Sequence, residues 1–168
     1  MTLDHLNELS PENAEAELLK CCGSTRWARE MTEARPFANF EELCERADAV
    51  CESLNDEDWL EAFRAHPKIG EKKAAGEQSQ QAQGWSAQEQ SGITDAPQQT
   101  ADELAQQNRD YEARFGFIFI VCATGKSPED MLAILRSRIG NDRQDEVLIA
   151  AEEQRKITRL RLEKLLSQ

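Results

Sequence analysis

Apolar residues recur at spacings of three and four along most of the chain, and polar signals for helix starts and stops separate the apolar runs. A Ser-Pro pair begins the run 10–23 and a glycine ends it. The pattern NFEE predicts a capping-box helix over 39–51. Acidic residues predict another helix over 55–66, because the helix dipole favours them in the first turn. That helix should end near its last residue, since Pro67 disfavours the α conformation just before itself.

The second half of the chain is also helical by pattern. A Ser-x-x-Glu motif at 86–89 predicts the start of a short helix that Gly92 ends. Capping patterns predict further helices over 100–111 and 127–140. A long amphipathic helix over 142–166 closes the sequence.

One segment departs from the helical pattern. Residues 115–125, FGFIFIVCATG, are rich in aromatic and β-branched side chains and read as a strand. One strand cannot form a sheet, and nothing nearby offers it a partner. We therefore predict an all-α fold, a single-domain helical bundle over residues 1–168, with one buried extended or irregularly helical segment.

Composition narrows the class of protein. The 168 residues are 39% hydrophobic and 31% charged, which is typical of a soluble globular protein. A formal net charge of −12 would repel the phosphates of nucleic acids. No apolar run approaches the ~18 residues of a membrane span, and the N-terminus lacks the basic and apolar regions of a secretory signal. We therefore expect neither a nucleic-acid nor a membrane partner.

The cysteines indicate a reducing compartment. Their number is odd, two are adjacent, and none forms a C-x-x-C motif, so we expect free, mostly structural thiols in a cytoplasmic protein. With only two histidines, a dedicated metal site is not expected either. The five cysteines are Cys21, Cys22, Cys44, Cys51 and Cys122.

Three polar residues are candidates for chemistry, and each has a plain structural alternative. His66, at the end of a predicted helix, could transfer protons or simply cap the last carbonyl groups. Glu89 could face a small ligand or only close the capping box with Ser86. Arg161 has apolar residues four positions to either side, so it either reaches past them to solvent or binds an oxygen-rich ligand. Taken singly, the structural alternative is the commoner outcome for each.

In combination, these residues match a known family. The matching stretches are FRAHPKIGE, WSAQEQSGI, NRDYEARFGFIFIVCATG and RKITRLRLEKLL, which fall within residues 59–166. Their order is specific, whereas a lone His-Pro pair is not. The chain resembles the 2-oxo-4-hydroxy-4-carboxy-5-ureidoimidazoline (OHCU) decarboxylases, which form (S)-allantoin at the last step of urate degradation. It departs from many animal members at residues 68–70, where Lys-Ile-Gly replaces Asp-Leu-Ala, and in a slightly longer segment between His66 and Glu89.

The resemblance implies an all-helical fold of the OHCU decarboxylase type, no metal or other cofactor, a ureidoimidazoline substrate and a homodimer. It makes His66, Glu89 and Arg161 the catalytic residues, with Arg159 as the alternative to Arg161. It also implies a substrate-binding set around the His-Pro pair, the S-x-x-E-Q motif and the apolar segment, whose backbone would hold the substrate ring. That set is Pro67, Ser86, Ala87, Gln88, Glu89, Gln90, Phe117, Phe119, Ile120, Val121, Cys122 and Ala123.

The implied chemistry suits these residue types. Loss of CO2 next to a conjugated ring leaves a carbanion that the ring delocalises, so the protein needs to orient the bond and protonate one face. A histidine suits that proton transfer, and Phe117 with its apolar neighbours would exclude water. Two alternatives stay open: a non-catalytic helical binding or regulatory module, and a lyase or hydrolase that acts on a related ureide.

Overall fold

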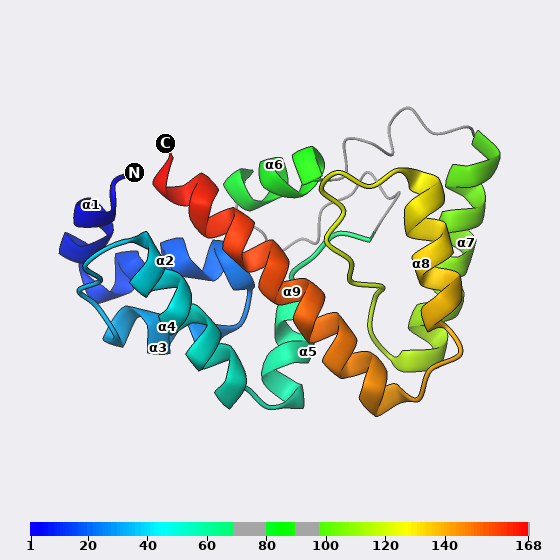
Figure 1. Ribbon diagram of the computed structural model, residues 1–168, viewed down its shortest axis with the longest axis horizontal. Helices are drawn as coiled ribbons and strands as arrows, with labels where there is room; N and C mark the ends of the chain where they lie inside the picture. Colours follow the sequence, from blue (N-terminus) through cyan, green and yellow to red (C-terminus); the bar gives the residue numbers. More distant parts are fainter. Residues whose placement is uncertain (69–79, 90–97, 168) are drawn as a thin grey trace. The chain divides into compact units, whose positions relative to one another are not determined.

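All regular secondary structure is helical in the part of the chain that the computed structural model describes, residues 1–68, 80–89 and 98–167. These residues include no β-strand, and the all-α prediction is confirmed. None of the described helices is both long enough and apolar enough to cross a membrane. In chain order the helices are α1 (Leu3–Glu8), α2 (Pro11–Cys22), α3 (Thr25–Glu33), α4 (Phe40–Ser53), α5 (Asp56–Arg64), α6 (Gln80–Glu89), α7 (Gln98–Phe115), α8 (Pro128–Arg138) and α9 (Arg143–Leu166) (Figure 1).

The helices fall into two compact units. The first unit comprises Met1–Ala62 and Arg155–Gln168, and the second comprises Phe63–Gln154. Helices α5 and α9 each contribute residues to both units. A single domain over the whole chain stays a prediction.

Helix ends in the first unit follow the local sequence signals. The side chain of Ser10 accepts a hydrogen bond from the Asn13 N–H at the start of α2, and Gly23 ends that helix with a left-handed φ of 86°. The side chain of Asn39 accepts from the Glu42 N–H at 2.9 Å at the start of α4. Local capping chemistry therefore decides where these helices begin and end.

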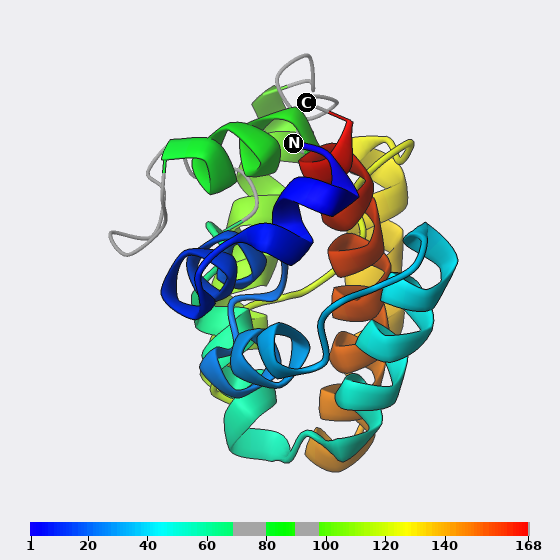
Figure 2. The same ribbon diagram turned by 90° about the vertical axis from the view of Figure 1, so that its left-hand side faces the viewer.

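Helix α4 lies beside the C-terminal half of α9 in the first unit (Figure 2). Arg155 of α9 forms an ion pair with Asp48 of α4 at 3.0 Å. The amino group of Met1 donates to the Leu165 carbonyl at 2.8 Å, so α1 begins next to the end of α9. Large apolar side chains from all these helices fill the core, among them Leu6, Leu18, Trp27, Met31, Leu43, Leu162 and Leu165.

The second unit packs α7 against α8, with an extended segment beside them (Figure 1). Helix α7 begins at Gln98, two residues before the predicted start. Gly116 follows its end with a φ of 80°, which lets the chain leave the helix without strain. Residues 117–123 are neither helix nor strand, and every one of them is buried. The prediction of one buried segment, extended or irregularly helical, is therefore confirmed for these residues.

A buried polar network joins α7, α8 and α9 in the second unit. Arg138 donates to Glu146 through Nε at 2.6 Å and to the Ile120 carbonyl at 2.8 Å. The Tyr111 hydroxyl donates to the same carboxylate, and Asn141 donates to its other oxygen at 2.8 Å. Burial, and then the hydrogen bond to Glu146, raise the pKa of Tyr111, so the phenol stays protonated and keeps donating.

This network predicts unequal effects for two neighbouring arginines of α8. Arg138→Met should lower the free energy of unfolding by about 3–5 kcal/mol, because it leaves the Glu146 carboxylate buried without its counter-charge. Arg136→Met removes an exposed pair with Glu103 and should cost only about 0–1 kcal/mol. Urea unfolding of the two variants measures the difference. Equal losses would contradict a central role for the network.

Candidate active site

His66 lies two residues beyond the end of α5 and makes a long-range contact. Its backbone N–H donates to the Phe63 carbonyl at 3.1 Å, which places it in the final turn before Pro67. Its ring Nε2 lies 2.7 Å from Oε1 of Gln154, 88 residues further along the chain. A residue that only capped its own helix would have no need of such a contact, so the ring is held in place by α9.

Two successive residues of α9 bind different parts of the candidate site. Gln154 is completely buried and meets His66. Glu153 accepts a hydrogen bond from the Cys122 N–H through Oε2 at 2.7 Å. Adjacent residues of a helix point about 100° apart, so one turn of α9 can reach both the histidine and the extended segment.

Side chains take the place of a neighbouring strand along residues 117–123. Asn108 Oδ1 accepts from the Phe119 N–H at 3.3 Å. Lys126 Nζ donates to the Cys122 carbonyl at 2.7 Å, next to the Glu153 contact on the same residue. Buried backbone groups need such partners, and these hold the segment at several points. Asn108 itself is buried, and its Nδ2 has no hydrogen-bond partner among the described atoms.

Aromatic rings pack together around Phe117 and Phe119 of this segment. Phe63, one turn before the histidine, lies 5.3 Å from Phe117 between ring centroids. Tyr111 contacts Phe117 and Phe119 edge to face, at 5.8 Å and 5.4 Å. These ring contacts join the end of α5 to the extended segment.

Glu89 is the last residue of α6, which corrects the predicted capping box. Helix α6 begins at Gln80, so Ser86 lies inside it as a buried residue and does not cap its start. The predicted end at Gly92 lies outside the described residues, as does the predicted site residue Gln90. A Ser-x-x-Glu pattern occurs within helices as well as at their starts, and here the helix already existed upstream.

Glu89 lies close enough to the extended segment to affect it electrostatically. Burial is the main reason why the pKa of the Cys122 thiol lies above its ordinary value. Lys126 opposes that rise, whereas the carboxylates of Glu153 and Glu89 add to it. Within the second unit, Glu89 acts on Cys122 of the extended segment, and α9 contacts both His66 and Cys122. On α6, Ala87 and Gln88 are exposed, and their contact with substrate stays a prediction.

Arg161 belongs to the first unit and is buried there, with 2% of its surface exposed. The interpretation in which it reaches past the core to solvent is therefore wrong. Its Nη1 donates to the Lys20 carbonyl at 3.4 Å, and its charge counteracts the effect of burial, which raises the pKa of Cys22 to about 11. Arg159, the alternative in the motif, is exposed, and a role of either arginine in ligand binding stays a prediction.

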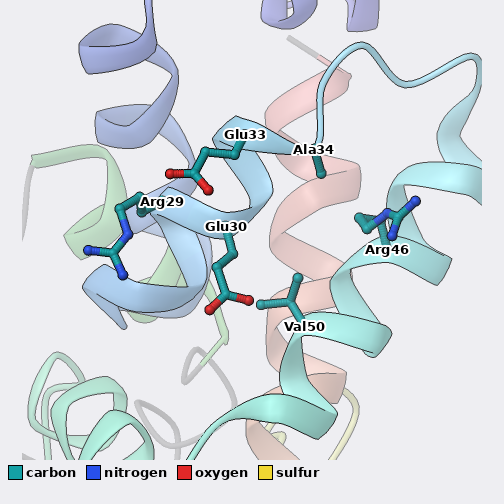
Figure 3. Close-up of a pocket in the computed structure, with 6 residues that line it drawn as sticks. All are labelled: Arg29, Glu30, Glu33, Ala34, Arg46 and Val50. Carbon is teal, nitrogen blue, oxygen red and sulfur yellow. The ribbon is translucent and has the colours of Figure 1, made fainter.

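A shallow groove of about 750 Å³ lies elsewhere in the first unit (Figure 3). Its lining residues are Arg29, Glu30, Glu33, Ala34, Arg46 and Val50, none of which is a predicted site residue. Figure 3 places the two arginines on opposite sides of the groove, and Glu30 is already paired with Arg26 at 2.8 Å. We assign no function to it.

Comparison with known proteins decides the family. The family model described as OHCU decarboxylase matches residues 7–163. The chain belongs to the OHCU decarboxylase family. It is 37% identical over 159 residues to the uric acid degradation bifunctional protein TTL of Arabidopsis thaliana. The matched region covers 95% of this chain and 49% of that protein. It is 27% identical over 168 residues to the bifunctional protein PucL of Bacillus subtilis, of which it covers 33%. The chain therefore spans half or less of the length of these two relatives.

A solved structure of the family has the same fold. The crystal structure of OHCU decarboxylase in the presence of (S)-allantoin is 37% identical in sequence and superposes with a TM-score of 0.79. The match covers 91% of this chain and 99% of that one. The OHCU decarboxylase type of fold is therefore confirmed as well as the helical class.

Sequence reasoning missed Asn108, Glu153 and Gln154. Asn108 is the first residue of the matching stretch NRDYEARFGFIFIVCATG, but no local pattern marks it as functional. Gln154 falls on the apolar stripe of α9, four residues after Ala150 and three before Ile157, where all three residues are buried. A polar residue on an apolar stripe indicates a buried hydrogen bond, because its side chain needs a partner inside the core.

The Glu153 contact predicts a local loosening of the extended segment. Glu153→Ala removes the charged acceptor of the Cys122 N–H, and such bonds contribute about 1.5–3 kcal/mol. Hydrogen exchange at the Cys122 amide should accelerate by about tenfold or more. Glu152→Ala, one residue away on the exposed side of the same turn, is the matched control. Unchanged protection of Cys122 in the Glu153 variant would disprove the anchoring role.

Proposed function

We propose that the chain decarboxylates 2-oxo-4-hydroxy-4-carboxy-5-ureidoimidazoline to (S)-allantoin in urate degradation. The observation that carries the proposal is membership of the OHCU decarboxylase family over residues 7–163. It is supported by the related structure determined in the presence of (S)-allantoin, which is 37% identical. The activity of the longer relatives is proposed here only for the part that this chain covers.

His66 is the proposed proton-transfer residue. The C–C bond to the carboxylate breaks, CO2 leaves, and the electron pair stays on the ring carbon and delocalises into the conjugated ring. The imidazole then delivers a proton to one face of the neighbouring ring carbon, which carries the ureido group. The carbon that lost CO2 becomes a ring carbonyl as its hydroxyl gives up a proton, and one-sided protonation makes the product a single enantiomer. Because the ring accepts the electron pair, the reaction needs neither a metal nor an organic cofactor.

The substrate is proposed to lie against the backbone of Phe119–Ala123, with Phe117 excluding water. The anchoring of that segment supports this role, since a fixed backbone loses little entropy on binding. A substrate oxygen would also satisfy the unpaired Nδ2 of Asn108. Glu89 would orient His66 or accept hydrogen bonds from ring or ureido N–H groups.

Further binding groups are proposed from the family pattern. Arg161 would bind a substrate oxygen through its planar guanidinium, as the family pattern implies for this buried arginine. Pro67, Ser86, Ala87, Gln88 and Gln90 complete the proposed binding set. Gln90 would pair with the ureido amide.

The domain organisation and oligomeric state are proposed from the family resemblance, and the compartment from the cysteines. We expect one OHCU decarboxylase domain over residues 1–168, active as a homodimer in the cytoplasm. The five cysteines are free and buried, which agrees with a reducing compartment.

The direct test generates the unstable substrate in the assay and measures the optical activity of the allantoin that forms. Urate is converted by the preceding enzymes of urate degradation, and optically active allantoin is followed by circular dichroism after the chain is added. Rapid formation of one enantiomer supports the proposal. A rate no faster than spontaneous decay, or a racemic product, would support the non-catalytic alternative.

Replacing His66 should abolish catalysis without unfolding the protein. His66→Asn keeps similar size and some hydrogen bonding, so the melting temperature should change little. Turnover should fall by about 10²-fold or more, the usual scale for a positioned acid or base. Residual product should lose chirality as spontaneous decay takes over. His5→Asn, at an exposed position of α1, is the control, and a fast enantiopure reaction by the His66 variant would remove His66 from the mechanism.

Replacing Arg161 should weaken ligand binding. Arg161→Lys keeps the charge but loses the planar fork that binds two oxygens at once. Titration calorimetry with (S)-allantoin should give a higher Kd for this variant than for wild type. Arg159→Lys makes the same change at the exposed alternative position and should bind like wild type. The reverse pattern would transfer the role to Arg159.

A further inference from the structure

Gln154 is the polar side chain of α9 that meets the ring of His66, at 2.7 Å between Oε1 and Nε2. We infer that Gln154 is a positioning residue that fixes the catalytic ring and determines which of its nitrogens exchanges the proton. This inference rests on the decarboxylation proposed above. It deepens that proposal by assigning the transferred proton to one atom of His66.

The chemistry of the two groups sets the direction of the contact. An amide oxygen can only accept, so His66 Nε2 must carry a hydrogen and donate it to Gln154. That hydrogen is present in both the neutral ring and the imidazolium. The contact is therefore unchanged when the ring gains or loses a proton, and the exchanging proton sits on Nδ1.

A neutral amide also suits a residue that must both give and recover a proton. A carboxylate at this place would favour the imidazolium and hold the proton on the ring. An amide fixes the ring plane without adding charge. It therefore orients the histidine while the ring titrates.

The position of Gln154 on α9 supports a role beyond packing. The residue has no exposed surface, and Ala150, Ala151 and Ile157 on the same stripe are buried apolar residues. An apolar side chain would pack at this place without a hydrogen-bond partner, whereas a buried amide is unfavourable unless it is paired. The contact with His66 supplies that pairing.

Charged residues on the surrounding elements do not change in the test. These residues include Arg64, Lys68, Glu89, Glu112, Arg143 and Glu153, which are the same in every variant. Lys68 is paired with Glu112 at 2.7 Å, and Glu153 accepts the Cys122 N–H. Any difference between variants at position 154 therefore reports on that side chain.

Two variants and one control test the inference in the full-length protein. Gln154→Leu removes the acceptor, and Gln154→Glu keeps the shape but adds charge. Gln144→Leu makes the first change at an exposed position of α9. Each protein is examined by NMR titration of its histidines and by the pH profile of kcat. The chain has only two histidines, so exposed His5 serves as an internal reference.

The expected results differ between the variants. Gln154→Leu should lower kcat by about 10²-fold, the scale for a misplaced catalytic group, with KM little changed. Gln154→Glu should raise the pKa of His66 above that of wild type and move the corresponding limb of the kcat profile to higher pH. The isosteric Glu variant keeps the inference testable if the Leu variant does not fold. Gln144→Leu should match wild type in both measurements.

Other outcomes separate this inference from the proposed function. If wild type is active and both Gln154 variants keep its kcat, pH profile and His66 titration, the positioning role is overturned. If wild type forms no allantoin above the spontaneous rate, the proposed function fails. In that case a shifted His66 titration in the Glu variant would still establish the contact, but not a role in catalysis.

Discussion

Residues 117–123 run through the core of the second unit without a strand beside them, and their buried N–H and C=O groups must nevertheless find partners. Side chains from three different helices meet this requirement. Asn108 of α7 accepts from Phe119, Arg138 of α8 donates to Ile120, and Glu153 of α9 accepts from Cys122. The arrangement of the helices around the segment is thus tied to the segment's own hydrogen bonds.

These partners create requirements of their own. A buried guanidinium needs a counter-charge, which Glu146 provides, and Tyr111 completes the coordination of that carboxylate. The same network leaves Arg138 over the ring of Phe119, 4.8 Å from its centroid. The segment is therefore fixed from several sides by buried hydrogen bonds and ring contacts.

The helices were largely predictable because their ends carry local chemistry. Ser127 accepts from the Asp130 N–H and Asp130 accepts in return, as the sequence pattern indicates. The same kind of pattern failed at Ser86, because a helix can contain Ser-x-x-Glu in its interior and the polar run before it gave no sign of helix. The extended segment was identified because its composition contradicted the helices around it.

Pairs of residues far apart in the sequence were not predictable from local patterns. Gln154 and His66 are separated by 88 positions, and no periodicity connects them. The family resemblance named the histidine but not its partner, because a motif marks where chemistry occurs and not what holds it in place. The contact partners of the segment were missed for the same reason.

Helix α9 has polar side chains at several of its buried positions. Gln154, Thr158 and Arg161 follow one another at spacings of four and three, which places them on one face, and all three are buried. Gln154 belongs to the second unit and the other two to the first. Leucine or alanine at these positions would bury apolar area without needing partners, as Leu162 and Leu165 do nearby. Polar groups on a core face lower stability unless each is paired. Buried polar residues on such a face need partners, and in the second unit the contact with His66 provides one for Gln154.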